Sequence, residues 1–285
     1  MTELPPRGGI VIAAHNESAV IGRCLDALEP LRQQGLAHIV VACNGCSDDT
    51  AAIARDRVGV TVLELAVASK AAALRAGDQV VAAGPRIYLD ADVVMTAQAA
   101  LDLFAALGPG SVLAARPPIR FESSRASLAV RLWYSIRGQL PSIQQRLWGA
   151  GTYALSVDGR RRFDEFPDIV SDDLFIDNLF SAGETAIVST DRVTVYTPLR
   201  TADLLRILVR SYRTQGDVAQ ETGAGPISSG QLGQLRDVAA LVARRPWLTP
   251  AAVVYVLLIS SARLRARSTP ASTAWERDNS SRESR

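Results

Sequence analysis

Short apolar runs alternate with helix-spaced segments through the first part of the chain. Gly9 to Ala14 is continuously apolar, and the segment after it places apolar residues three and four positions apart, as in an amphipathic helix. The alternation recurs as His38 to Ala42 before Asp48 to Arg57, Val60 to Leu65 before Lys70 to Ala83, and Ile87 to Leu89 before Ala97 to Leu107. Repeated strand–helix units predict an α/β fold with a mostly parallel, doubly wound sheet.

The pattern is less regular in the second half. We expect strands at Val112 to Ala115, Ala186 to Val188 and Val193 to Tyr196, and helices at Ser127 to Gly138, Val157 to Phe163, Asp172 to Phe180 and Asp203 to Asp217. The late strands indicate a mixed edge of the sheet. A Gly/Ser-rich stretch, Gly223 to Gly233, precedes the last helical segments. We therefore predict an α/β domain over 1–220, a helical C-terminal appendage over 221–267 and a mobile tail over 268–285.

Composition narrows the class of protein. The chain has 285 residues and a formal net charge of +2, enough length for a large α/β domain and no overall charge that indicates nucleic acid. Three cysteines, an odd number, favour a reducing, cytoplasmic compartment over a disulfide framework. Cys43 and Cys46 alone offer too few ligands for structural zinc, and we interpret them as turn residues. The first apolar stretch stops at His15, so no signal peptide is expected.

Two carboxylates follow a short apolar strand in the segment Arg86 to Asp92. Asp90 and Asp92 stand at the carboxyl end of that strand, where open α/β sheets bind their ligands. Mg²⁺ and Mn²⁺ prefer such oxygen ligands, and Mg²⁺ commonly takes only one or two protein carboxylates beside phosphates and water. Solvated loop carboxylates are the alternative for an isolated Asp-x-Asp. The position after a strand favours a site for a divalent metal and a diphosphate.

Three further segments place polar groups at strand ends or at a helix start. They are Ala13 to Glu17, Cys43 to Thr50 and Ser69 to Leu74. Together with Asp90 to Asp92, their order and spacing closely resemble family 2 of the nucleotide-sugar glycosyltransferases, from about Gly9 to Asp217. The resemblance implies a GT-A fold and transfer of a sugar from a nucleotide-diphosphate donor, with a UDP-sugar as the expected donor and Mg²⁺ or Mn²⁺ as cofactor.

The resemblance also assigns nucleotide-sugar contacts. These fall on Ala14, Glu17, Asn44, Lys70, Asp90, Ala91, Arg210 and Arg213, with Asp92 and Asp90 holding the metal. Asn44 replaces the commoner Asp, and because an amide both donates and accepts hydrogen bonds, the base of the nucleotide stays open. The alternatives are a plain tight turn at Asn44-Gly45 and a solvated helix-start lysine at Lys70.

Arg210 and Arg213 match an Arg-x-x-Arg-Trp element that holds the diphosphate in processive relatives. Thr214 stands where that element has Trp, which weakens any prediction of processivity. A guanidinium binds phosphate oxygens well, so either arginine could neutralise the leaving diphosphate. A solvated face of the helix is an equally good interpretation.

Asp172 and Asp173 open a predicted helix and resemble the Glu-Asp element of inverting family members. Asp173 falls on the position of the catalytic base, which takes the proton of the acceptor hydroxyl as its oxygen attacks the anomeric carbon. Capping of the helix by acidic residues is the alternative. The segment just upstream, with Trp148, Gly149 and Gly151, resembles the glycine-rich loop that lines the acceptor and donor-sugar pocket.

The last apolar stretch, Trp247 to Ala262, is followed by Arg263, Arg265 and Arg267. It is shorter than the roughly 20 apolar residues that a spanning helix needs. We expect a packed helix, or a peripheral membrane contact through 247–267 that brings the enzyme to the inner face of the membrane and to a lipid-linked acceptor. A helix that spans the membrane stays open as the third alternative.

The pattern as a whole predicts a metal-dependent, inverting glycosyltransferase acting on a hydroxyl acceptor. A sugar-phosphate nucleotidyltransferase is the first alternative, although the segment after the first strand lacks a glycine-rich triphosphate loop. A catalytically silent GT-A scaffold at a membrane and a retaining enzyme of the same fold also stay open.

Overall fold

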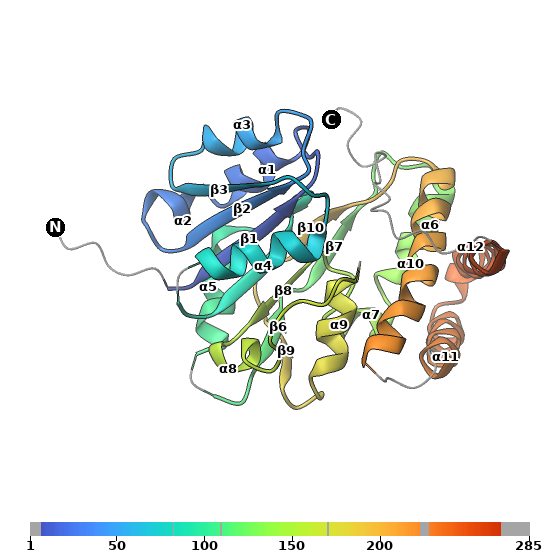
Figure 1. Cartoon of the computed structure of the whole chain (residues 1–285). Coiled ribbons are helices and arrows are strands. Elements are labelled where there is room, and N and C mark those ends of the chain that lie inside the picture. The colour runs from blue at the N-terminus through green and yellow to red at the C-terminus, as the bar shows by residue number, and fades with distance from the viewer. Residues whose placement is uncertain (1–6, 82, 109, 170, 223–227, 269–285) are drawn as a thin grey trace. The chain divides into compact units, whose positions relative to one another are not determined.

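The computed structural model describes residues 7–81, 83–108, 110–169, 171–222 and 228–268; within these, the side chains of 214–222, 228–232 and 267–268 are not described. The chain forms two compact units (Figure 1). The first takes in the chain up to Ile119 together with Leu147–Val195, and the second takes in Arg120–Arg146 and the chain from Tyr196 onward.

The first unit is built on a seven-stranded sheet with the order β3-β2-β1-β4-β8-β6-β9. Its strands are β1 (Gly9–Ala14), β2 (His38–Asn44), β3 (Val60–Leu65), β4 (Arg86–Asp90), β6 (Ala114–Arg116), β8 (Thr152–Leu155) and β9 (Thr185–Ile187). The pairs β1–β2, β2–β3, β1–β4 and β6–β9 are parallel, whereas β8 runs antiparallel to both β4 and β6. The predicted mostly parallel, mixed α/β sheet is confirmed.

Helices cover this sheet, and β1 is therefore buried on both of its faces. They are α1 (Ile21–Ala27), α2 (Glu29–Gln33), α3 (Thr50–Arg55), α4 (Lys70–Val80), α5 (Ala97–Ala106), α8 (Val157–Arg160) and α9 (Asp172–Leu179). In Figure 1, α4 lies across β1 and β2. A Cβ atom at Gly77 of α4 would come within 2.4 Å of Val11 Cγ1, so only glycine permits this close helix–strand packing.

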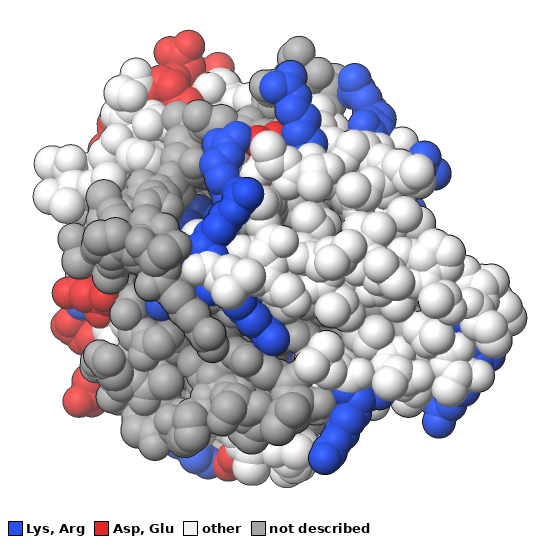
Figure 2. Space-filling view, turned by 90° about the vertical axis from the view of Figure 1, so that its right-hand side faces the viewer, with Lys and Arg blue, Asp and Glu red and all other residues white. Residues whose placement is uncertain are grey.

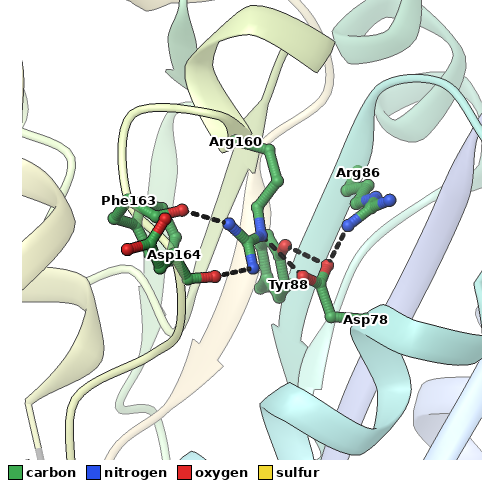
Figure 3. Close-up of polar contacts among 6 residues, drawn as sticks. All are labelled: Asp78, Arg86, Tyr88, Arg160, Phe163 and Asp164. Carbon is green, nitrogen blue, oxygen red and sulfur yellow. Dashed lines mark hydrogen bonds and ion pairs between the residues drawn. The ribbon is translucent and has the colours of Figure 1, made fainter.

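A buried charge network joins α4 to β4 and to the segment after β8 (Figure 3). Asp78 accepts hydrogen bonds from Tyr88 Oη at 2.7 Å and from Arg160 Nε at 2.5 Å, and it also pairs with Arg86. Arg160 in turn donates to the carbonyl oxygens of Phe163 and Asp164 at 2.7 and 2.9 Å. Because Asp78, Arg86 and Arg160 are paired with one another, the network fixes the chain between α8 and α9 against the sheet.

Two short strands complete the first unit. β5 (Val93–Val94) pairs antiparallel with β10 (Val193–Tyr196), with Val93 opposite Val195. β7 (Ile119–Glu122) lies where the chain passes from the first unit to the second.

The second unit is helical. It contains α6 (Leu128–Arg137), α7 (Pro141–Gln144), α10 (Thr201–Thr222), α11 (Ser228–Arg244), the 3₁₀ turn η1 (Pro246–Leu248) and α12 (Thr249–Ser268). α12 packs on α6 and α10, and the rings of Trp133 and Tyr255 stack with centroids 5.3 Å apart. Residues 120–146, which the sequence pattern leaves within the α/β domain, therefore belong with the C-terminal helices.

Several predicted boundaries differ from the structure. The two units do not divide at residue 220, because α10 belongs to the second unit. The predicted helix over 157–163 is helical only as far as Arg160, and α11 begins at Ser228, inside the predicted Gly/Ser-rich break. Residues 223–227 and 269–285 lie outside the described residues, so the predicted tail is described only at Ser268.

The C-terminal helix is longer than the predicted apolar stretch. Within the described part of the chain, one segment, Pro246–Ala266, is long and apolar enough to span a membrane, with 21 residues. The expectation that this stretch is too short is therefore wrong. Length and composition alone do not assign a spanning helix, since core helices of soluble proteins pass the same test.

Candidate active site

The sheet order brings three of the predicted segments together. β2, β1 and β4 are neighbours and run parallel, with Ala14 opposite Cys43 and Ala13 opposite Asp90. Ala14, Asn44 and Asp90 therefore share one edge of the sheet, the edge where open α/β sheets bind ligands.

Hydrogen bonds join the loops after β1 and β2. The His15 ring nitrogen Nδ1 lies 2.6 Å from the carbonyl oxygen of Asn44, and Glu17 N donates to Thr50 Oγ1 at 2.7 Å. Asn16 has a φ of 53°, rare for a residue other than glycine, and its Oδ1 accepts a hydrogen bond from Ser47 N at 2.7 Å. The two loops thus form one rigid surface, with the backbone strain at Asn16 held by its partner loop.

Asn44 is fully buried and is part of β2. Its Nδ2 donates to the carbonyl oxygen of Ala14 at 2.8 Å, which ties the ends of β1 and β2 together. Gly45, with a φ of 57°, makes the turn that follows, so the plain-turn alternative applies to Gly45 and not to Asn44. Glu17 is also buried, at 7% exposure. The predicted contacts of Asn44 and Glu17 with a nucleotide stay predictions.

Cys43 and Cys46 are both free cysteines. Cys43 is buried within β2, so its interpretation as a turn residue is wrong, whereas Cys46 lies in the turn after the strand. Cys46 Sγ accepts a hydrogen bond from Asn16 N at 3.3 Å and donates to the carbonyl oxygen of Ala14 at 3.5 Å. These contacts support the interpretation of Cys46 as a turn residue.

Lys70 is the only lysine in the chain, which otherwise carries 30 arginines as its basic residues. It begins α4, where Ser69 caps the helix by accepting a hydrogen bond from Ala72 N. Its Nζ lies 2.7 Å from Asp90 Oδ1 and 2.7 Å from Asp172 Oδ1. Burial lowers the pKa of Lys70, but Asp172 and Asp90 outweigh it and raise the pKa above its ordinary value. The solvated-lysine alternative is wrong.

The carboxylate pair after β4 is partly accessible. The Asp90 side chain is 36% exposed, Ala91 is buried and Asp92 is half-buried. Burial raises the pKa of Asp90 to about 6, against the opposing effect of Lys70 and with the help of Asp172. Asp90 N donates to the carbonyl oxygen of Gly151 at 2.8 Å, which fixes the backbone of the pair.

The glycine-rich segment packs directly on Asp90. Gly151 has a φ of 63°, and a Cβ atom there would lie 2.6 Å from Val93 Cγ2 and 3.1 Å from Asp90 Oδ2. Gly149 also has a positive φ, of 80°. Trp148 precedes it and is half-buried. The segment then enters β8, a strand that the sequence pattern does not predict.

The two carboxylates at the start of α9 have different surroundings. Asp172 is 5% exposed and accepts a hydrogen bond from Tyr153 Oη at 2.9 Å, besides its ion pair with Lys70. Asp173 is half-buried, and its two oxygens accept from Gly149 N at 2.7 Å and Leu174 N at 2.8 Å. Burial and the neighbouring Asp172 raise the pKa of Asp173. Asp172 is buried and held by Lys70 and Tyr153, whereas Asp173 is more exposed.

Tyr153 is the site residue that the sequence analysis misses. It lies in β8, two positions after Gly151, and its ring stacks on Tyr88 with centroids 5.1 Å apart. The alternation of a strand after Gly151 would have placed it on the same face as Gly151. Its partner Asp172 is distant in sequence, so no local signal indicates the hydrogen bond.

Arg210 and Arg213 belong to α10 in the second unit and are half-buried. Their predicted contact with a diphosphate stays a prediction. Among the residues that the structure describes, no group of three or more His, Cys, Asp and Glu side chains is arranged to hold a metal ion. A pair such as Asp90 and Asp92 would need ligands from a bound diphosphate and from water.

Comparison with known families decides the class of protein. The model of the family "Glycosyl transferase family 2" matches residues 9–163, which contain β1 to β8 and the pair Asp90 and Asp92. The chain belongs to this family. It is therefore a glycosyltransferase, as the ordered motifs of the sequence predict. A comparison with curated protein sequences finds no match.

Solved structures of glycosyltransferases share the fold of this family 2 chain. A mannosyltransferase from Pyrobaculum calidifontis, in complex with GDP-Man and Mn²⁺, is 17% identical, with a TM-score of 0.59 over 93% of this chain and 80% of its own. Glucosyl-3-phosphoglycerate synthase from Mycobacterium tuberculosis, in complex with Mn²⁺, UDP and glucosyl-3-phosphoglycerate, is 20% identical, with a TM-score of 0.55 over 76% and 80%. S. aureus TarS in complex with UDP is 11% identical, with a TM-score of 0.50 over 91% of each chain.

Proposed function

We propose that this chain catalyses the metal-dependent, inverting transfer of a sugar from a nucleotide-diphosphate donor to a hydroxyl acceptor. The observation that carries the proposal is the position of Lys70, whose ammonium lies 2.7 Å from both Asp90 and Asp172. It joins the carboxylate expected beside the diphosphate to the helix that carries the candidate base, Asp173. One site thus contains both halves of the chemistry, departure of the diphosphate and deprotonation of the acceptor.

The donor binds at the shared edge of β2, β1 and β4. Ala14, Glu17 and Asn44 form the floor for the nucleoside, and Lys70, Asp90 and Ala91 lie beside the diphosphate. A UDP-sugar is the expected donor, and GDP-sugars are the natural second candidate because the similar mannosyltransferase is described in complex with GDP-Man.

Asp90 and Asp92 fit Mg²⁺ or Mn²⁺. Both offer hard carboxylate oxygens at a strand end, and the 36% exposure of the Asp90 side chain leaves room for phosphate and water ligands. When bound, the metal would neutralise charge on the leaving diphosphate. Lys70 holds Asp90 in one orientation, so the pair is arranged before the donor arrives.

Asp173 is the general base. Asp173 is half-buried, and its carboxylate can accept the proton of an acceptor hydroxyl, while the hydrogen bonds from Gly149 N and Leu174 N fix its orientation. Its raised pKa makes the carboxylate a better proton acceptor than an ordinary Asp. Asp172, held by Lys70 and Tyr153, positions the start of α9 and does not contact the acceptor.

The acceptor site lies along Trp148, Gly149 and Gly151, because glycines with positive φ let the backbone approach a ligand closely. We infer that the acceptor is lipid-linked and that the enzyme acts at the cytoplasmic face of a membrane. The support is the apolar segment Pro246–Ala266 in the same chain.

A binding experiment tests the donor and metal roles. Isothermal titration of the parent with UDP and GDP, with and without Mn²⁺, is compared with Asp92→Asn and with Asp158→Asn, a control whose side chain is 78% exposed. We expect Mn²⁺ to strengthen nucleotide binding in the parent and in the control but not in Asp92→Asn. A parent that binds neither nucleotide would support the silent scaffold, and binding that ignores Mn²⁺ would contradict the metal role.

Inversion at the anomeric carbon is tested separately. Without an acceptor, water takes the place of the hydroxyl, and proton NMR reads the anomeric configuration of the sugar released from the donor. Inversion is the expected result. Release of sugar with the configuration of the donor would establish a retaining enzyme instead.

A further inference from the structure

The outer face of α12 lacks the charged side chains that the exposed face of a helix in a soluble protein usually carries. Val253, Val256, Leu257 and Leu264 are 53%, 36%, 60% and 66% exposed, at the spacing of one side of a helix. Trp247, in the turn before the helix, is 73% exposed. From residue 246 to residue 262 the sequence contains no Asp, Glu, Lys or Arg. These five side chains form an outward apolar stripe, which we call the α12 stripe.

The opposite face of α12 is part of the core of the second unit. Ala251, Ala252, Tyr255, Ile259 and Ala262 are all less than 8% exposed, and α12 packs on α6 and α10. If α12 crossed a bilayer on its own, Trp133 would lose its stacked partner Tyr255. The packing therefore favours a helix that stays in the unit and presents only its outer stripe.

Positive charge surrounds the α12 stripe. Arg244 and Arg245 precede it, Arg265 follows it, and all three are exposed. Over residues 120–146, 196–213 and 233–266, the part of the second unit whose side chains are described, the sequence has 14 arginines and three acidic residues. Figure 2, turned toward the side of Figure 1 that carries α12, shows a broad uncharged area with basic side chains at several points of its border.

The exposed apolar stripe and the arginines around it together indicate the kind of partner that binds this surface. We propose that the α12 stripe docks on the surface of an anionic phospholipid bilayer, with α12 parallel to the membrane plane. Apolar side chains enter the boundary between headgroups and acyl chains, and the flanking guanidiniums bind anionic headgroups. A second copy of the chain fits less well, because a two-fold interface would bring the flanking arginines of the two copies close together.

The docking proposal rests on the exposed apolar side chains of the α12 stripe and on the arginines around it. It does not depend on the catalytic proposal. Combined with the catalytic proposal, membrane docking narrows the class of acceptor, since an enzyme held at a bilayer meets hydroxyl acceptors that carry lipid anchors. Neither membrane docking nor the use of a lipid-anchored acceptor requires a change in the fold.

Vesicle flotation of the full chain tests the docking surface. The vesicles contain phosphatidylcholine alone or phosphatidylcholine with phosphatidylglycerol, and the double variant Val253→Ser/Leu257→Ser removes apolar surface without adding charge. Val58→Ser is the matched control, because Val58 is 87% exposed in the first unit. We expect the parent and the control to partition to the anionic vesicles, and the double variant to lose at least tenfold in partition. Tryptophan fluorescence, to which the exposed Trp247 contributes beside three other tryptophans, should shift to the blue only when binding occurs.

Three results would overturn the proposal: no partition of the parent, equal partition of the double variant, or equal loss in Val58→Ser. Sedimentation velocity without vesicles covers the alternative occupant, since a parent dimer that the double variant abolishes, together with no vesicle binding, would make the stripe a self-interface. Titration with UDP and Mn²⁺ separates the two proposals, because the double variant should bind nucleotide like the parent. A parent that binds vesicles but no nucleotide would contradict only the catalytic proposal.

Discussion

Lys70 and Asp172 form an ion pair of 2.7 Å between the start of α4 and the start of α9, two helices separated by about a hundred residues of sequence. The same ammonium reaches Asp90 at the end of β4. A lysine suits this position because a compact ammonium with three donors can serve two carboxylates from different elements. The pair therefore sets the distance between the two halves of the proposed site.

Replacing Lys70 by Met should destabilise the protein by about 3 kcal/mol, because Asp172 would be left buried without its cation. Chemical denaturation measures the loss. Arg57→Met is the control, since Arg57 pairs with an Asp26 side chain that is 59% exposed, and such surface pairs contribute at most about 1 kcal/mol. Adding Asp172→Asn to Lys70→Met should recover part of the loss. Equal effects of Lys70→Met and Arg57→Met would contradict a structural role for the pair.

Asp173→Asn should lower kcat by about 10²- to 10⁴-fold, the usual contribution of a general base, with little change in donor affinity. The amide keeps the size of the side chain and can still accept a hydrogen bond from Gly149 N. Single-turnover kinetics and nucleotide titration give the two quantities. If Asp173→Asn turns over near the parental rate while Asp172→Asn does not, the base is the neighbouring carboxylate. If both variants keep full activity, α9 does not supply a base.

The pH profile of kcat/KM should show an acid limb above the ordinary range of aspartate, which centres near about 3.9. A general base works in its ionised form, so activity is lost as the pH falls through its pKa. Burial and Asp172 raise the pKa of Asp173, which moves this loss to higher pH. The profile is measured with saturating metal, and the limb should disappear in Asp173→Asn. A limb at or below the ordinary value would contradict the assignment.

Gly151→Ala should impair both stability and turnover. The backbone strain of an alanine at a φ of 63° costs about 1–2 kcal/mol, and the new Cβ would press on Val93 and Asp90. Gly35→Ala is a matched control, since Gly35 has the same φ of 63° and a Cβ added there would meet no atom within 4 Å. In thermal or chemical denaturation, both variants should be less stable than the parent by the cost of the backbone strain. Only Gly151→Ala should lose activity. Unchanged kcat in Gly151→Ala would separate this glycine from the function of Asp90.

The sequence alone predicts the parts of the molecule that local patterns determine. Apolar runs followed by helix-spaced segments predict β1 to β4 and the helices between them, because burial on both faces of a parallel sheet requires continuous apolar strands. The position of Asp90 and Asp92 after such a run places them at the edge where ligands bind. The ordered motifs likewise predict the family, which the match over residues 9–163 shows.

Contacts between distant segments were decided only by the tertiary structure. No spacing in the sequence distinguishes a solvated Lys70 from one that holds Asp90 and Asp172, or shows that Asn44 is buried against Ala14. Tyr153 and the antiparallel β8 were missed because a strand of four residues carries little periodicity. Residues 120–146 join the C-terminal helices through packing such as that of Trp133 on Tyr255, and an apolar pattern does not name its partner. Local periodicity determines which faces are buried, whereas the fold determines which buried and charged groups meet.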